Sequence, residues 1–147
     1  MTELLIRKSI EVNASAGTLW RVLTDNAFIP QYMFGCVTET DWKPGSPLLW
    51  KGAADGKLYV KGNVISVDPQ RRLEYTVIDP NNPAIEDIPA NYLTMVYELK
   101  EHGERSSTVE FIQGDYAKVA QGQKRYEETL QGDDYILAKI KELAEAV

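Results

Sequence analysis

Residues 93–113 read LTMVYELKEHGERSSTVEFIQ, and this stretch decides the fold. Two runs within it, 93–100 and 107–113, alternate apolar and polar side chains with the period of a β-strand that buries one face. The polar residues between them, which include Gly103, are typical of a hairpin turn. The side chains expected on the buried face are Met95, Tyr97, Leu99, Val109, Phe111 and Gln113. The stretch therefore predicts an antiparallel hairpin with an aromatic inner face.

The chain between residue 37 and this hairpin also consists of short strand-like runs separated by turns. Turn signals recur at 43–46, 55–56, 68–69 and 79–83, and the runs between them are rich in Val, Ile, Tyr and Thr. Such closely spaced short strands indicate an antiparallel meander rather than βαβ units. The prolines in 79–91 exclude a central strand there and predict a loop across an opening of the fold. The predicted strands are Val37–Asp41, Leu48–Gly52, Lys57–Val67, Leu73–Ile78, Leu93–Lys100 and Ser107–Gln113.

The residues before the meander predict one more strand and two short helices. The stretch from Leu4 to Val12 alternates apolar and polar side chains, as a strand does. Ser15 is a candidate N-cap for a first helix. Asp25 and Asn26 are candidates to cap a second one.

After Gly114 the pattern becomes helical. A long C-terminal helix is predicted, with Gly132 as a possible bend and with an apolar face formed by Tyr126, Leu130, Leu137, Ile140 and Leu143. A seven-stranded antiparallel sheet needs a cover for one face, and this helix is the candidate. The whole chain, 1–147, is expected to form a single α+β domain.

Composition and charge exclude several classes of function. With 16 basic and 22 acidic residues the net charge is -6, which disfavours nucleic acid and anionic membrane surfaces. No stretch approaches the roughly 20 apolar residues needed for membrane insertion, and the first eight residues do not resemble a signal peptide. A single cysteine, Cys36, allows no internal disulfide and no zinc site of Cys and His ligands. We therefore expect a cytoplasmic protein without metal or cofactor.

Several short motifs, in their order and spacing, resemble the START-like (SRPBCC) superfamily. Within it they resemble the AHSA-type branch, named after the activator of heat-shock-protein ATPase. The resemblance covers nearly the whole chain and rests on the segments VNAS at 12–15, LWRVLTD at 19–25, DWKPGS at 41–46, DG at 55–56 leading to Gly62, VDP at 67–69, RLEY at 72–75 and YEL at 97–99 ahead of Thr108. The resemblance implies a helix-grip fold, in which a curved sheet surrounds a long C-terminal helix, with a cavity. It implies no universal catalytic residue.

The aromatic residues are the strongest functional signal in the sequence. The chain has three Trp, eight Tyr and three Phe, and buried tyrosine hydroxyls need hydrogen-bond partners. A packed core is one interpretation, and a partly polar cavity is the one we favour. Trp50 is the open case, because a bulge would exchange the faces of Leu48 and Trp50 with those of Leu49 and Lys51. The candidate ligand-binding residues are Phe28, Tyr32, Phe34, Trp50, Tyr75, Met95, Tyr97, Phe111, Gln113, Tyr126 and Asp133.

Asp133 stands where family members often carry the tryptophan of a Gly-Trp pair. Helical spacing from Leu130 and Leu137 puts it on the apolar face or at its edge. If it faces a cavity, burial would raise its pKa and make it a proton acceptor or hydrogen-bond partner. The alternative is that the helix bends at Gly132 and leaves Asp133 in water.

Three hypotheses of function follow, in order of preference. The first is binding of an apolar or amphipathic small molecule between the sheet and the C-terminal helix. The second is interaction with a chaperone ATPase, ranked lower because we do not expect the separate N-terminal domain of the activator in this chain. The third is a cyclase- or hydrolase-like enzyme that uses Asp133 and tyrosine hydroxyls. No catalytic residue is assigned, because His102, the single histidine, is expected at a solvated hairpin tip. The protein is either a monomer or a homodimer.

Overall fold

The elements alternate as the sequence predicts, with one strand, two helices, six strands and a helical C-terminus. They are described by a computed structural model for residues 3–131 and 135–147. In chain order they are β1 (Ile6–Val12), α1 (Ala16–Thr24), α2 (Ile29–Tyr32), β2 (Cys36–Glu39), β3 (Pro47–Gly52), β4 (Leu58–Asp68), β5 (Arg72–Val77), the 3-10 turn η1 (Pro89–Asn91), β6 (Leu93–Gly103), β7 (Ser106–Gly114), the 3-10 turn η2 (Tyr116–Lys118), α3 (Gly122–Gln131) and α4 (Tyr135–Glu145).

The strands form one seven-stranded antiparallel sheet in the order β1-β7-β6-β5-β4-β3-β2. The six strands of the meander pair with their neighbours in sequence, and β1 then adds to the far side of β7. The predicted strands are all present. The largest shift of a boundary is in β6, which continues to Gly103 instead of ending at Lys100. The α+β helix-grip prediction is confirmed.

The register of the central strands explains where the core lies. Tyr97 pairs with Leu73 on one side and with Phe111 on the other, and Met95 pairs in the same way with Tyr75 and Gln113. Because side chains alternate across a strand, paired residues share a face, and these build one continuous apolar surface. All of them are buried except Gln113, which is half-buried.

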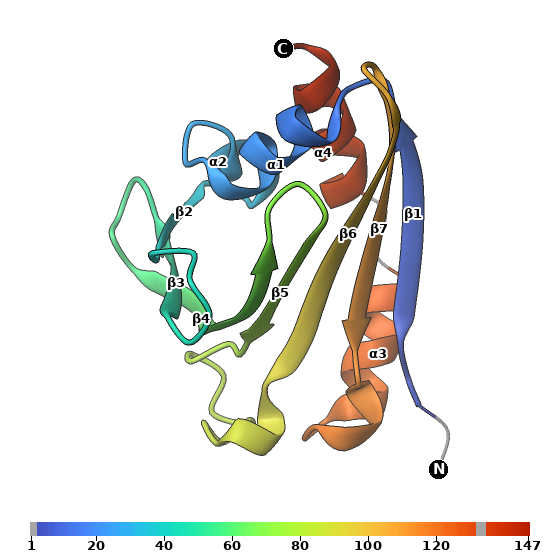
Figure 1. Ribbon diagram of the computed structural model, residues 1–147. Helices are drawn as coiled ribbons and strands as arrows, with labels where there is room; N and C mark the ends of the chain where they lie inside the picture. The colour runs from blue at the N-terminus through green and yellow to red at the C-terminus, as the bar shows by residue number, and fades with distance from the viewer. Residues whose placement is uncertain (1–2, 132–134) are drawn as a thin grey trace.

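Helices cover this surface at one end of the sheet. Figure 1 shows α1, α2 and α4 gathered near the end where β6 turns into β7, while α3 lies toward the opposite end. Ser15 caps α1 as predicted, since its Oγ accepts a hydrogen bond from the Thr18 amide at 3.1 Å. The buried residues of α4 are Leu137, Ile140 and Ala144.

The prediction that Asp25 and Asn26 cap the second helix is wrong. The residue before α2 is Phe28, and it makes no side-chain capping bond. Asn26 instead joins the α1–α2 connection to β2. Its side chain donates to the Thr38 carbonyl at 2.9 Å and accepts from the Thr38 amide at 2.9 Å. A side-chain amide that mimics a strand partner in this way satisfies the polar groups of the short edge strand.

The C-terminal segment is described as two helices, α3 and α4, where the sequence predicts one long helix. Asp133 lies outside the described residues. The predicted apolar face continues through α4, but Leu130 in α3 is 47% exposed, against expectation. In α3 only Gly122 is buried, so the cover over the sheet comes mainly from α4 and α1. Among the described residues, no helix is long and apolar enough to span a membrane.

Gly62 is a position where only glycine fits. A Cβ atom there would lie 1.6 Å from the backbone oxygen of Thr76 in the neighbouring strand β5. We expect Gly62→Ala to lower the free energy of unfolding by about 2–3 kcal/mol, because the two strands would have to move apart. Chemical denaturation followed by circular dichroism measures this. The control is Gly103→Ala, since nothing lies within 4 Å of the added atom. Equal stability of the two variants would contradict the close approach of β4 and β5.

Candidate functional site

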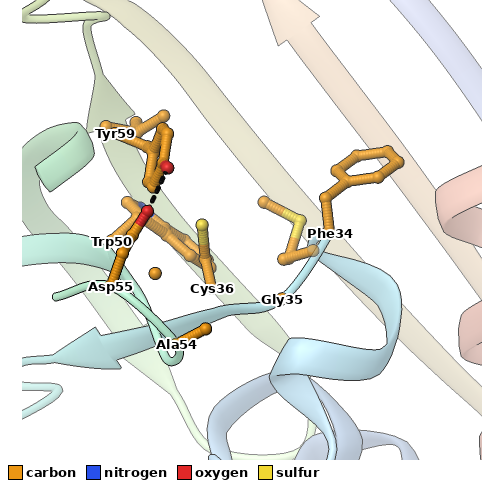
Figure 2. A pocket seen from close by; sticks show the side chains of 10 residues that line it. Phe34, Gly35, Cys36, Trp50, Ala54, Asp55 and Tyr59 are labelled. Atoms are coloured by element: carbon orange, nitrogen blue, oxygen red, sulfur yellow. Dashed lines mark hydrogen bonds between the residues drawn. The ribbon is translucent and has the colours of Figure 1, made fainter. Parts of the chain in front are cut away.

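A pocket of about 490 Å³ opens between the C-terminal end of α2 and strands β2, β3 and β4. We call it the α2–β4 pocket. Its apolar walls are Met33, Phe34, Trp50, Ala54 and Val60. Its polar groups are Cys36, Asp55 and Tyr59, and Gly35 and Gly52 complete the lining. Figure 2 shows the indole of Trp50, the thiol of Cys36 and the Asp55–Tyr59 pair facing the same space.

The α2 side of the pocket is built by the way this helix ends. Phe34 and Gly35 both adopt left-handed backbone conformations, with φ of 55° and 85°. The Gly35 amide closes the turn by donating to the Pro30 carbonyl at 2.9 Å. This turn leaves the Phe34 side chain 74% exposed at the rim, where its ring stacks on Tyr135 of α4 with centroids 5.2 Å apart.

The β3–β4 side depends on a β-bulge. Trp50 pairs with Val60, but the next residue, Lys51, pairs with Leu58, so Tyr59 is an extra residue in β4. In a regular strand Tyr59 and Val60 would face opposite sides of the sheet. The bulge turns both toward the pocket, which is a common effect of bulges at functional sites.

Gly52 allows Asp55 and Tyr59 to approach the strand. A Cβ atom on Gly52 would lie 2.2 Å from Asp55 Oδ1 and 2.9 Å from the Tyr59 ring. The Tyr59 hydroxyl donates to Asp55 Oδ2 at 2.5 Å, drawn as a dashed line in Figure 2. The Lys57 amide donates to Asp55 Oδ1 at 2.9 Å. Both carboxylate oxygens therefore have protein donors.

These hydrogen bonds set the charges in the pocket. The Tyr59 hydroxyl, followed by the Lys57 amide, lowers the pKa of Asp55, because both stabilise the carboxylate form. The same contact raises the pKa of Tyr59. Burial, and then the Asp55 charge, raises the pKa of the Cys36 thiol. At neutral pH the pocket therefore carries one carboxylate, a neutral phenol and a neutral thiol.

Trp50 forms the inner wall of the pocket. It is 2% exposed, and its ring lies 5.9 Å from that of Tyr75. Leu48 is buried on the same face, which settles the open question of which residues of β3 point inward. The indole Nε1 is buried, and no hydrogen-bond partner for it exists among the residues that the structure describes.

Behind Trp50 the aromatic side chains of the sheet pack on one another. Tyr97 stacks on Phe111 with centroids 4.3 Å apart and planes 6° apart, and Tyr75 lies 6.5 Å from Tyr97. Burial raises the pKa of both the Tyr75 and the Tyr97 hydroxyls. The Tyr32 hydroxyl donates to the Leu23 carbonyl at 3.0 Å. The Tyr32 hydroxyl therefore has an acceptor within the protein, and the stacked rings of Tyr97 and Phe111 are part of the buried core.

The residues predicted to bind a ligand lie in different parts of the structure. Phe34 and Trp50 line the α2–β4 pocket, while Tyr32, Tyr75, Met95, Tyr97 and Phe111 belong to the buried core. Phe28 is half-buried, with the Arg21 guanidinium 5.6 Å from its ring centroid.

At the far end of the sheet, Tyr126 lies against Tyr116, and Gln113 accepts a 3.5 Å bond from the Tyr116 hydroxyl. Asp133 lies outside the described residues, so the enzyme hypothesis built on it stays a prediction.

Sequence reasoning missed Met33, Cys36, Asp55, Tyr59 and Val60 as pocket residues. In the sequence Asp55 indicates only an Asp-Gly turn, and Cys36 bears only on the absence of a disulfide and of a zinc site. The β3–β4 bulge has no recognisable signal in the sequence. Within residues 3–131 and 135–147, no group of three or more His, Cys, Asp or Glu side chains is placed to hold a metal ion.

The family follows from a comparison that covers most of the chain. Residues 13–145 match the family described as Activator of Hsp90 ATPase homolog 1-like protein. The chain belongs to this family. A search among curated proteins finds no match.

Solved structures from several organisms are similar to this chain. A protein from Cytophaga hutchinsonii is 28% identical with a TM-score of 0.72, covering 99% of this chain and 97% of its own. A protein from Mesorhizobium loti is 16% identical with a TM-score of 0.75, covering 97% and 98%. An HSP90 activator from Plasmodium falciparum is 12% identical with a TM-score of 0.67, covering 95% and 94%. The last two likenesses show the fold alone.

The Asp55–Tyr59 contact makes a prediction about pH. The pKa of Asp55 is lower in the folded protein than in the unfolded chain. Ionised Asp55 therefore stabilises the folded protein at pH values above the ordinary carboxyl pKa, and this contribution is lost as the pH falls through the lowered pKa. We expect Tyr59→Phe to raise the Asp55 pKa toward its ordinary value, as measured by NMR titration of the carboxyl carbon. The control is Tyr92→Phe, which removes a similar bond to Asp87 and should leave Asp55 unchanged. An unchanged Asp55 pKa in Tyr59→Phe would contradict the contact.

Proposed function

We propose that this activator-homologue protein binds an apolar or amphipathic small molecule in the α2–β4 pocket. The observation that carries the proposal is the pocket itself, about 490 Å³ in volume, with apolar walls and a few polar groups. Sites for small molecules commonly have volumes of about 300–1,000 Å³ and this combination of many apolar and few polar groups.

The driving force is removal of apolar surface from water. Ligand contact with Met33, Phe34 and Val60 would contribute about 25 cal/mol per Å² of apolar surface buried. The inner wall is rigid, because Trp50 packs against the buried row of Tyr75, Tyr97 and Phe111. A wall that does not reorganise lowers the entropic cost of binding.

The proposed site differs in place from the cavity that we expected between the sheet and the C-terminal helix. The aromatic side chains of the central strands belong to the buried core of the described residues. The C-terminal region still contributes to the rim, since Tyr135 of α4 stacks on Phe34.

Two neighbouring alanines give a matched test of binding. Ala54 lines the pocket, whereas Ala53 is exposed and does not line it. We expect Ala54→Trp to weaken binding of a neutral apolar fluorescent dye more than about tenfold, because the indole would fill the space that the ligand needs. Ala53→Trp should bind as the unchanged protein does. Fluorescence titration measures both, and native mass spectrometry tests for a co-purified molecule. Equal dye binding by both variants would refute this site.

A second candidate function is regulation of an Hsp90-type chaperone. It is supported by membership of the family and by the likeness to an activator from Plasmodium falciparum. In this case we expect saturating amounts of the protein to raise the ATPase rate of the chaperone in a coupled assay.

Ala54→Trp separates the two functions, because it closes the pocket while leaving the rest of the surface unchanged. If chaperone binding uses another surface, the variant keeps its effect on the ATPase rate. No change in the rate at a large molar excess of the unchanged protein would contradict the chaperone role.

A further inference from the structure

Trp50 carries a hydrogen-bond donor that the protein leaves unused. The indole lines the α2–β4 pocket, the residue is 2% exposed, and its Nε1 has no partner among the described residues. Buried polar groups in folded proteins are almost always paired, because an unpaired one forfeits the hydrogen bond that it made with water. An unpaired donor in the wall of a pocket is therefore a feature that a ligand can explain.

Other buried or half-buried donors in the same region are satisfied. Trp42 donates from its Nε1 to the Thr24 carbonyl at 3.0 Å, and the Tyr32 hydroxyl donates to the Leu23 carbonyl at 3.0 Å. The Asp55 oxygens, which are acceptors in the same pocket, already receive bonds from Tyr59 and Lys57. Among the described residues, the buried side-chain donor without a partner is therefore the Nε1 of a residue that lines the pocket.

The negative charge in the pocket limits the chemical classes of ligand that can bind there. Asp55 is the charged group of the lining, and its hydrogen bonds keep it ionised at neutral pH. A ligand carboxylate or sulfonate would be repelled by it in these partly apolar surroundings. An oxygen acceptor without charge has no such penalty.

From this arrangement we propose that the α2–β4 pocket takes an uncharged apolar molecule that bears a carbonyl oxygen, and that Trp50 Nε1 donates to this oxygen. The inference rests on the proposed function and adds the chemical class of the ligand to it. A ketone, ester or amide provides the acceptor, and the apolar remainder contacts Met33, Phe34 and Val60.

Access to the donor requires one side chain of the wall to rotate. Nε1 is shielded from water in the free protein. Tyr59 lies over Gly52, two residues from Trp50 on the same strand, and is 38% exposed. Its ring has open solvent to turn into, and its hydroxyl is held by one bond to Asp55. Tyr59 is therefore the lining side chain that we expect to move when a ligand enters.

The first experiment needs no variant. The probe is 6-propionyl-2-(dimethylamino)naphthalene, a neutral apolar dye with one ketone oxygen, and the readout is the indole N–H region of a ¹⁵N–¹H NMR spectrum. We expect the Trp50 signal to move downfield as the dye saturates the pocket, while the signal of Trp42, already hydrogen-bonded to Thr24, stays in place. A Trp50 signal that does not move downfield at saturation overturns the proposal.

The second experiment compares two probes on the unchanged protein and on one variant. Trp50→Phe keeps an aromatic ring and removes the donor. We expect it to weaken binding of the ketone dye about five- to tenfold, the usual effect of losing one hydrogen bond to a neutral group. Binding of 2-(dimethylamino)naphthalene, which lacks the ketone, should not change. Equal weakening of both probes, or of neither, overturns the proposal. Circular dichroism verifies that the variant is folded.

Ala54→Trp distinguishes failure of this inference from failure of the proposed function. If both probes bind and Ala54→Trp abolishes both, the pocket is a ligand site whatever the Trp50 signal does. An unchanged Trp50 indole N–H signal would then contradict only the inference that the ligand bears a carbonyl oxygen. If neither probe binds in a way that depends on Ala54, the ligand site itself is refuted, and the inference with it.

Discussion

The pairing of Tyr97 with Leu73 and Phe111 in the centre of the sheet is the contact on which the rest of the structure depends. It places the Tyr97 and Phe111 rings face to face, with Tyr75 beside them, on the side of the sheet that the helices cover. Slippage of the register by one residue would turn these rings to solvent and bring charged side chains such as Glu98 and Glu110 inward. The aromatic surface therefore specifies the register, and the register specifies the order of the meander.

The same aromatic row decides where a ligand site can lie. Its members pack ring against ring in the buried core beneath the helices. The row ends at Trp50, and beyond it the strands β2 to β4 and the end of α2 leave the α2–β4 pocket. A rigid core behind a more open rim is a common arrangement for a binding site, since the core fixes the wall and the rim admits the ligand.

Local backbone irregularities give this pocket its polar groups. The extra residue Tyr59 in β4 and the missing side chain at Gly52 bring the Asp55–Tyr59 pair to the rim. Each irregularity interrupts regular pairing or packing in the sheet. Each also directs polar atoms toward the α2–β4 pocket. The unpaired Trp50 donor belongs to a residue of the same wall, and this is the physical basis for proposing a ligand there.

Local patterns in the sequence were enough to predict the fold class, the seven strands, the Ser15 cap and the inward-facing residues of β6 and β7, because these depend on alternation and capping between near neighbours in the chain. The sequence did not determine the α2–β4 pocket. Phe34 and Trp50 were predicted as site residues, but Cys36, Asp55 and Tyr59 were not. Only the tertiary structure decided which aromatic side chains fill the core and which border a space, because a filled core and a cavity share one pattern of alternation. It also decided that Tyr59 turns toward the pocket, since that depends on how β4 pairs with β3, a relation between two strands that no single stretch of sequence carries.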